Sequence, residues 1–455
     1  MSERTENWFD SHEELLYSVS RTLWEHPEGS EQEYQSCALL KKLMEEQGFT
    51  VTAPAAGLDT AFAASYGSGR PRIGFLAEYD ALPGLAQETA ASVSPIPSQP
   101  FGHGCGHNLL GTAAAGAAIA LKEAMEGENL PGTVILYGCP SEEVMVGKIV
   151  MTQNHVFDDL DVAISWHPGD RNRASEESYQ AMLSMEYHFQ GKASHAAMAP
   201  EEGFSALDAV ELMDVGVNYL REHVPQGGQL HYVILSGGEK PNIVPEKAAV
   251  WQFIRANTTQ DLRRIAARLD DIAKGAALMT GTTVEKKVLT GCNETRIVPA
   301  LARLLEQVMA QEIAPPVWTE EEKAFARELL TSLGQSADTL KQDYGKDVWE
   351  KPLDDGTAAL TGKTVNILGS SDISDVSYVV PTCMLFAACY PKGTPNHTWA
   401  VTACAGGSIG QKGMVYAGRV MAAAGWHLLT DEGLRAKVKD SFQEALQGAV
   451  YEPVR

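Results

Sequence analysis

The fold is decided by two short apolar runs, RIGFLA at residues 72–77 and TVILYG at residues 133–138. A third run, DVAISW, follows at residues 161–166, and residues 109–126 have the composition of a helix. Alternating strands and helices favour a parallel sheet, because parallel neighbours need a crossover connection. We therefore expect an α/β sheet, largely parallel, with helices on both faces.

The pattern changes after residue 183. Strands and helices then follow in the order β-α-β-β-α-β, at residues 185–190, 205–222, 229–235, 248–254, 259–278 and 283–289. That order describes one compact α+β module. Because α/β character returns with a strand at 382–390 and a helix at 410–428, the module is predicted as an insert. We place it at residues 184–291, between the two parts of the main domain, 1–183 and 292–455.

Charge and composition narrow the possible partners. The 455 residues include 36 Lys plus Arg against 59 Asp plus Glu, a formal net charge of −23, which disfavours binding to nucleic acid or an anionic membrane. The N-terminal residues lack an apolar signal segment, and the longest small-apolar stretch, 109–121, is too short to span a bilayer. The seven cysteines form no C-x-x-C pair, which fits a reducing compartment, so we expect a cytoplasmic protein.

Acidic and imidazole side chains follow the predicted strands at the point where each strand ends. They are Glu78, Asp80, Glu142, Glu143, His167 and His397. Ligands of open α/β sheets bind beyond the carboxyl ends of the strands, so these side chains should meet at one edge. Crowded there without compensation they would be costly, whereas divalent cations would neutralise them. The sequence therefore predicts a metal site at this edge.

The loop GHGCGHN, residues 102–108, adds Cys105 and His107, two positions apart. In an extended loop both side chains can face one ion, and the helix that follows would favour the thiolate that metals require. A phosphate cradle is a weaker reading, because the G-x-G-x-x-G spacing is absent. A nucleophilic Cys105 is chemically reasonable, but it would leave the strand-end Glu pair and two histidines without a role.

The chain resembles the family of co-catalytic metallopeptidases that includes aminoacylases, carboxypeptidase G and plant auxin-conjugate hydrolases. The resemblance is carried by GHGCGHN (102–108), PSEEV (140–144), WHPG (166–169), GKASHAAMAP (191–200) and GTPNHTW (393–399), and it runs through most of the chain. It implies a phosphorylase/hydrolase-like, mostly parallel-sheet catalytic domain in which residues 184–291 form an inserted ferredoxin-like α+β dimerisation or lid domain.

The same resemblance implies a role for individual residues. The metal ligands would be Cys105, His107, Glu143, His167 and His397. Glu142 would be the general base, Asp80 would orient a ligand, and His195 in the insert would reach across a dimer to polarise the scissile carbonyl. Asn242 and Arg255 would hold the substrate's carbonyl or carboxylate. Glu78 stands where many members have a histidine ligand, and His107 is expected to supply that imidazole.

These roles imply an enzyme that hydrolyses the amide bond of an N-acyl amino acid with two divalent ions per chain, Mn or Zn. The expected substrate is p-aminobenzoyl-glutamate, cleaved to p-aminobenzoate and glutamate. Alternatives are another N-acyl amino acid, an auxin-type conjugate or a dipeptide, and, in a different class, a non-catalytic subunit that supports a paralogous catalytic partner. The expected assembly is a homodimer, a higher homo-oligomer, or a hetero-oligomer with a paralogous subunit.

Overall fold

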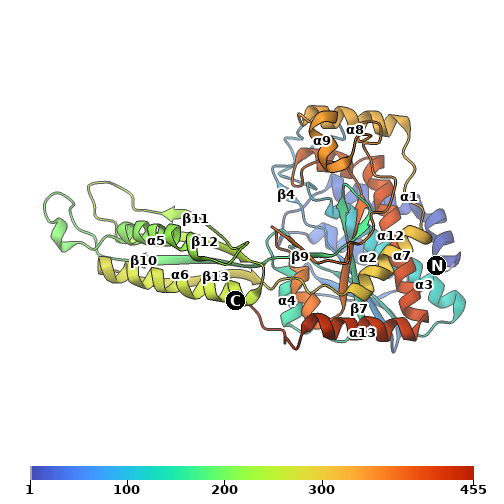
Figure 1. Ribbon diagram of the computed structural model, residues 1–455, viewed down its shortest axis with the longest axis horizontal. Coiled ribbons are helices and arrows are strands. Elements are labelled where there is room, and N and C mark those ends of the chain that lie inside the picture. Colours follow the sequence, from blue (N-terminus) through green and yellow to red (C-terminus); the bar gives the residue numbers. More distant parts are fainter. Residues whose placement is uncertain (1–2, 455) are drawn as a thin grey trace. The chain divides into compact units, whose positions relative to one another are not determined.

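The computed structural model describes residues 3–454 and contains two compact units (Figure 1). The first unit comprises the chain up to Glu176, together with Arg296–Thr364 and Val376–Val450. The second unit comprises Glu177–Thr295, Val365–Asp375 and the C-terminal residues from Tyr451. The second unit therefore includes two short segments that are distant from the insert in sequence.

A seven-stranded sheet forms the centre of the first unit, in the order β1-β2-β6-β3-β7-β15-β8. The four central strands are mutually parallel: β6 (Gly132–Gly138), β3 (Arg72–Ala77), β7 (Val162–Gly169) and β15 (Thr382–Ala388). The strands at the edges pair antiparallel: β1 (Thr50–Thr52), β2 (Phe62–Ser68) and β8 (Arg173–Ala174). The predicted α/β architecture is confirmed, with a parallel centre and antiparallel edges.

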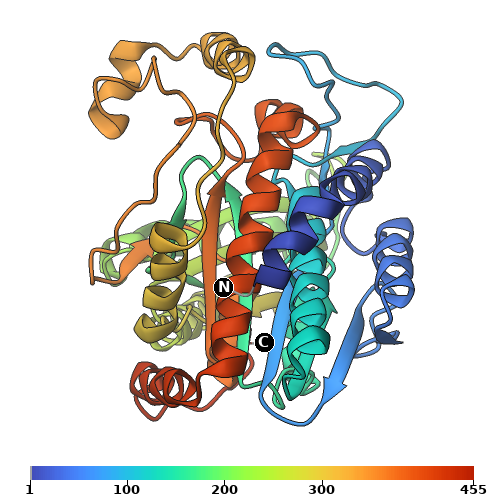
Figure 2. The same cartoon turned by 90° about the vertical axis from the view of Figure 1, so that its right-hand side faces the viewer.

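Three long helices, α1 (Glu3–Glu25), α3 (His107–Glu128) and α12 (Ser408–Thr430), lie side by side on one face of this sheet (Figure 2). Helix α3 is rich in alanine and is buried on every side, which lets its neighbours approach closely. A Cβ atom at Gly111 would lie 2.6 Å from the backbone oxygen of Glu78, so α3 passes directly over the end of β3. On the opposite face, Phe157 packs on Tyr137 with ring centroids 5.0 Å apart.

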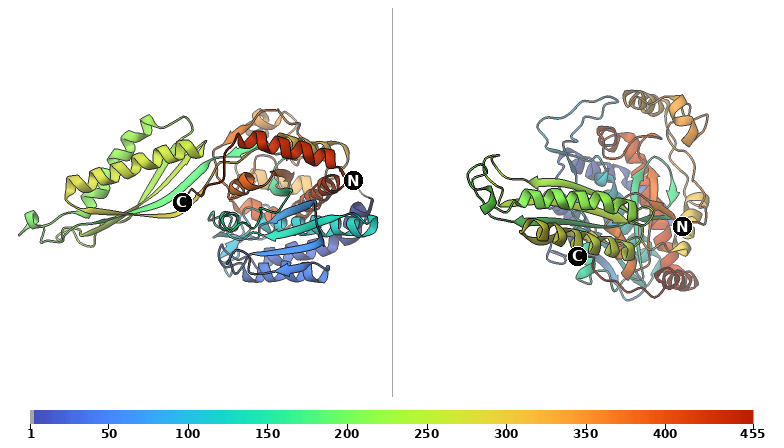
Figure 3. Two further views of the ribbon diagram at one scale, coloured as in Figure 1. Left: turned by 90° about the horizontal axis from the view of Figure 1, so that it is seen from below. Right: turned by 60° about the vertical axis from the view of Figure 1, so that its left-hand side comes forward.

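The second unit contains a four-stranded antiparallel sheet in the order β11-β12-β10-β13. Its elements are β10 (Ala181–Gln190), α5 (Ala206–Leu220), β11 (Gln229–Ser236), β12 (Lys247–Ala256), α6 (Thr259–Thr280) and β13 (Thr283–Cys292). Figure 3 shows α5 and α6 on one face of the sheet, where alternate residues of β10, Met185, Tyr187 and Phe189, are buried against them. The predicted ferredoxin-like topology is confirmed.

Shorter elements complete the two units. Those of the first unit are α2 (Tyr34–Glu46), β4 (Leu82–Pro83), β5 (Phe101–Gly102), α4 (Gly147–Gln153), α7 (Pro299–Gln311), α8 (Glu320–Ser332), α9 (Ala337–Tyr344), α11 (Trp399–Ala405) and α13 (Glu432–Leu446). In the second unit β9 (Glu177–Tyr179) pairs in parallel with β14 (Val365–Ile367), and α10 (Ile373–Val379) begins there. Among residues 3–454, no helix has both the length and the apolar character needed to cross a membrane.

Candidate metal centre

Cysteine, histidine and glutamate side chains gather in the first unit at the carboxyl ends of β3, β6, β7 and β15. They form three overlapping groups, Cys105 with His107 and His167, Cys105 with Glu143 and His397, and Glu78 with His107 and Glu142. Within each group the potential ligand atoms lie within 4.8 Å of one another. The structure thus brings together the five ligand candidates and Glu142, and it adds Glu78 to them.

Strand pairing explains why His167 faces this cluster. The indole Nε1 of Trp166 donates a hydrogen bond of 3.0 Å to the backbone oxygen of Leu110, which places Trp166 on the face covered by α3. Successive side chains of a strand point to opposite faces, so His167 is turned to the other face. Because β7 pairs with β15 as far as Gly169, His167 lies within the strand; the prediction that it follows the strand is wrong.

Asp80 connects three segments of the chain behind the cluster. Its Oδ1 accepts a hydrogen bond of 2.9 Å from Nδ1 of His107. Its Oδ2 accepts bonds from Oγ of Ser30, at 2.8 Å, and from the backbone nitrogen of Glu143, at 3.0 Å. Burial favours the neutral acid, but these donors outweigh it and hold the pKa of Asp80 below its usual range. The ionised carboxylate fixes both His107 and the loop of Glu143.

The rings of His107 and His167 are oriented through their Nδ1 atoms. That of His107 is bonded to Asp80, and that of His167 donates a 2.7 Å bond to the backbone oxygen of Pro168. Each Nε2 atom is thereby directed at the cluster. Burial opposes the charged ring of His107, but Cys105 and Asp80 outweigh it and hold its pKa well above the usual value, so a bound cation would displace the proton on Nε2. Burial, followed by the charge of His107, lowers the pKa of His167 to about 4, so its neutral ring can bind a cation near pH 7.

The thiol of Cys105 lies 3.3 Å from Nε2 of His167, immediately before α3. Burial, followed by the charge of Glu143, raises the pKa of this thiol well above its usual value. Burial therefore acts against the thiolate that the start of α3 would favour. The same result weakens a nucleophilic role, which needs a lowered pKa. Metal binding would instead displace the thiol proton.

Two buried polar atoms in the cluster indicate where a cation fits. Nε2 of His107 and Oε1 of Glu143 lie 4.0 Å apart, and neither has a hydrogen-bond partner among the described residues. Oε2 of Glu143 is 3.5 Å from Nε2 of His397, and burial raises the pKa of Glu143. Buried atoms of this kind are rarely left unsatisfied, and sulfur, imidazole and carboxylate donors together suit Zn or a similar divalent ion.

The loops that carry Glu143 and His397 are held in unusual backbone conformations. Ser141 and His397 have φ values of 59° and 57°, in the left-handed region that few non-glycine residues adopt. The side chain of Glu33 accepts bonds from the backbone nitrogen and Oγ of Ser141, at 2.8 and 2.9 Å, and the backbone nitrogen of His397 donates to Gly104 at 3.1 Å. Conformations of this kind persist only where surrounding contacts enforce them.

Lys148 is a buried residue of the cluster that sequence reasoning missed. Its ammonium lies 2.7 Å from Oε1 of Glu78, while Oε2 of Glu78 is 3.4 Å from Nε2 of His107. Burial opposes ionisation of Glu78, but the charge of Lys148 outweighs it and holds the pKa of Glu78 below its usual range. The only sequence signal was a lysine within the apolar run VGKIVM, residues 146–151.

The remaining predicted site residues lie in the second unit. Nδ1 of His195 accepts bonds of 3.2 Å from the backbone nitrogens of Ala197 and Met198, which places its ring proton on Nε2. The backbone oxygen of Asn242 accepts a 3.1 Å bond from the nitrogen of Ala196. His195 and Asn242 are therefore neighbours, on loops at one end of the sheet.

Arg255 lies toward the other end of the same sheet. It pairs with Met182 in the register of β10 and β12, whereas the loop of His195 follows Gln190, which pairs with Lys247. Its guanidinium lies 4.5 Å from the ring centroid of Phe253, on the face that α5 and α6 leave open. The second unit therefore does not bring Arg255 together with His195 and Asn242.

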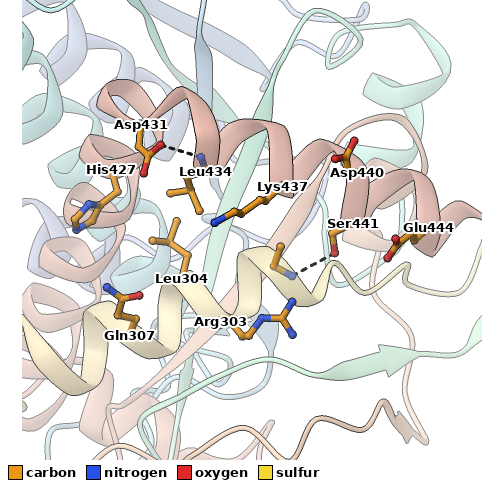
Figure 4. A pocket seen from close by; sticks show the side chains of 11 residues that line it. Arg303, Leu304, Gln307, His427, Asp431, Leu434, Lys437, Asp440, Ser441 and Glu444 are labelled. Atoms are coloured by element: carbon orange, nitrogen blue, oxygen red, sulfur yellow. Dashed lines mark hydrogen bonds between the residues drawn. The ribbon is translucent and has the colours of Figure 1, made fainter.

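A cavity of about 590 Å³ lies elsewhere in the first unit, between α7 and α13. Arg303 and Lys437 line it together with Asp431, Asp440 and Glu444, so charges of both signs face it (Figure 4). None of the metal-ligating groups found among residues 3–454 includes a residue of this cavity. This cavity therefore adds no potential metal ligand to the cluster at the sheet edge.

Comparison with known proteins identifies the class. The chain belongs to the M20 family of peptidases and is a metallo-amidohydrolase: residues 180–281 match the family model of the peptidase dimerisation domain, and a full-length relative is 39% identical. That relative is a subunit of the p-aminobenzoyl-glutamate hydrolase of Escherichia coli (strain K12), aligned over 95% of this chain and 93% of its own length.

Two further proteins extend the comparison. Xaa-Arg dipeptidase of Mus musculus is 28% identical over 98% of this chain and 93% of its own length. The crystal structure of a dinuclear metal binding peptidase of the M20 family from Bacillus subtilis has a TM-score of 0.59 at 17% identity, covering 91% of this chain and 98% of that one. At that identity the likeness is one of fold.

Proposed function

We propose that this amidohydrolase cleaves p-aminobenzoyl-glutamate, or a close N-acyl amino acid, to the free acid and the amino acid. The observation that carries the proposal is the cluster of sulfur, imidazole and carboxylate donors with two buried atoms facing one space. The name of the 39% identical relative supports the choice of substrate. We further propose the limits 1–183 and 292–455 for the catalytic domain and 184–291 for the insert.

In this proposal Cys105, His107, Glu143, His167 and His397 hold two divalent cations, Mn or Zn, and Asp80 orients His107. When bound, such cations lower the pKa of a water and stabilise negative charge on the amide oxygen. Glu142 accepts the proton of the attacking water and returns it to the leaving nitrogen, because it lies in the cluster beside a ligand. Thiol and imidazole donors favour Zn, while the carboxylates tolerate Mn.

The insert is proposed to complete the site in an oligomer. His195 carries its proton on Nε2, so it can donate a hydrogen bond to the developing oxyanion of a substrate bound to a partner chain. Asn242, beside it, is proposed to contact the substrate's carbonyl, and Arg255 its carboxylate. The dimerisation-domain match supports an oligomer, either a homodimer or a complex with a paralogous subunit. The isolated cysteines support a cytoplasmic location.

The first experiment is metal analysis of the purified protein combined with an assay of p-aminobenzoyl-glutamate hydrolysis in added Mn²⁺ or Zn²⁺. The wild type should bind about two ions per chain and cleave only when they are present, and Cys105→Ala should lose both properties. If the protein binds metal and cleaves an Xaa-Arg dipeptide but not p-aminobenzoyl-glutamate, the substrate belongs to the dipeptide class. Metal binding without cleavage of either substrate would favour the non-catalytic subunit. Cleavage by a metal-free wild type would overturn the metal centre.

A further inference from the structure

Lys148 is a fully buried lysine at the edge of the proposed metal centre. Its side chain is 0% exposed and that of its partner Glu78 is 5% exposed. One oxygen of Glu78 is held by the ammonium at 2.7 Å, and the other faces Nε2 of His107 at 3.4 Å. A buried ion pair contributes little net stability compared with apolar packing, so such a pair at a ligand cluster calls for a functional explanation.

The backbone brings Lys148 into the cluster by a close approach that only glycine permits. A Cβ atom at Gly147 would lie 1.8 Å from the backbone oxygen of Pro140, just before the Glu142–Glu143 pair. Helix α4 therefore starts against this loop, and its second residue is Lys148. Glu78 is fixed from the other side, because α3 passes over its backbone oxygen at Gly111.

The contacts of Glu78 show what Lys148 changes. The ammonium of Lys148 bonds one oxygen of Glu78 at 2.7 Å and leaves the other oxygen facing the cluster. A carboxylate in a buried environment is unfavourable without a cation beside it, so removal of Lys148 would leave Glu78 dependent on a bound metal ion for its neutralisation.

We propose that Lys148 is a positioning residue that neutralises Glu78 and holds it with one oxygen turned to the cluster, so that this pair sets the affinity of the centre for divalent cations. The inference rests on the proposed metal centre. It predicts opposite effects of the two partners, since Lys148 repels an incoming cation and Glu78 attracts it. A purely structural pair would change metal affinity in one direction or leave it unchanged.

The test is metal affinity of the full chain, measured by competition with a chelating dye for Mn²⁺ and Zn²⁺. Lys148→Met should tighten binding by about tenfold or more and Glu78→Gln should weaken it by a similar factor, because each removes one nearby charge of opposite sign. The double variant should return to near the wild-type value. Lys148→Met should also lower the metal-free unfolding midpoint, and saturating metal should largely restore it.

Lys122→Met is the matched control, since Lys122 is also poorly exposed and paired, with Glu126 at 3.1 Å, but lies about 22 Å along α3 from His107. It should leave metal affinity unchanged. The inference is overturned if both single variants shift affinity in the same direction, or if neither shifts it. If Lys148→Met does not fold, unchanged affinity in Glu78→Gln alone overturns it. A wild type that binds neither ion would overturn the metal centre itself, a result distinct from these.

Discussion

Asp80 in the first unit and Asp214 in the second are both buried carboxylates, yet their pKa values move in opposite directions. Three donors bond to Asp80 and hold its pKa below the usual range. Asp214, 5% exposed on α5, accepts a bond of 3.2 Å from Nε2 of Gln252, and burial raises its pKa to about 6. Burial raises the pKa of both groups, so the donors around Asp80 and the charge of His107 decide the outcome.

The difference between the two pKa values shows in which region hydrogen-bond donors and cations stabilise buried negative charge. Around the cluster, hydrogen-bond donors and the ammonium of Lys148 keep Asp80 and Glu78 ionised, which a cation site requires. In the core of the insert no such set surrounds Asp214, and its Oδ2 has no partner among the described residues. The cluster around Asp80, the first region, thus has ionised carboxylates that can bind a cation. The core of the insert, the second region, in contrast contains one buried acid, Asp214, whose raised pKa favours its protonated form.

Glu142→Gln should give the largest effect, because in the proposed mechanism Glu142 is the carboxylate of the first region that gains and loses a proton. We expect kcat for p-aminobenzoyl-glutamate to fall by about 10²–10⁴ while metal content stays at the wild-type level. Steady-state kinetics and elemental analysis measure the two quantities. Glu25→Gln, at the exposed end of α1, is the control. Near-normal turnover in Glu142→Gln would remove this residue from the mechanism.

His195→Ala tests the second region, which is proposed to contribute only a hydrogen bond. Loss of one oxyanion donor should reduce kcat by about 10²–10³ and leave metal affinity unchanged. His188→Ala, an exposed histidine of β10 paired with Glu186 at 2.7 Å, should have little effect on either. Loss of bound metal in His195→Ala would show that the insert supports the cation site directly, and the contrast between the regions would fail.

Asp80→Asn should weaken metal binding by about 10–100-fold, because it removes the acceptor that fixes the Nδ1 proton of His107. Competition with a chelator measures the affinity. Asp161→Asn is a suitable control, since Asp161 also accepts a backbone bond, from Arg72 at 2.7 Å, at the opposite end of β3. Equal affinities in Asp80→Asn and wild type would mean that the donors around Asp80 serve folding alone.

Asp214→Asn should have the smallest effect on metal binding and catalysis, and should change only the pH dependence of the insert's stability. Because the folded pKa of about 6 is above the unfolded value, the folded form binds more protons, and stability falls as pH rises from about 4 to 6. The variant should lose this slope, a change of about 3 kcal/mol at most across the window. Hydrogen exchange of α5 peptides at pH 4 and pH 7 measures it. The exposed Asp271→Asn should keep the wild-type slope.

The parts of the structure that follow from local rules could be predicted from sequence. Period-two alternation predicted residues 185–190 of β10 but not its first four residues, and apolar runs predicted β3 and β6 to within one residue at each end. Parallel strands end at one edge of a sheet, and from this rule the sequence alone predicted that Glu143 and His397 lie in one cluster.

Features that depend on packing between distant segments could not be predicted. The pair of Lys148 and Glu78 joins residues far apart in the chain, through a close contact of Gly147 that no pattern reveals. Strand β14 has only the three residues Val365–Ile367, too few to show a period, and its pairing with β9 assigns a distant segment to the second unit. The burial that raises the pKa of the Cys105 thiol likewise depends on this packing.

Helix α3 connects a fully buried part of the first unit's core to the candidate ligand His107. His107 is its first residue, and the small side chains from Ala113 to Ala120 are all 0% exposed. A helix moves as a rigid rod, so a larger side chain at Ala117, about 15 Å from His107 along the axis, would displace the imidazole rather than only strain its neighbours. Selection for altered metal preference in a mutant library should therefore recover substitutions in this alanine-rich stretch as well as at the ligands.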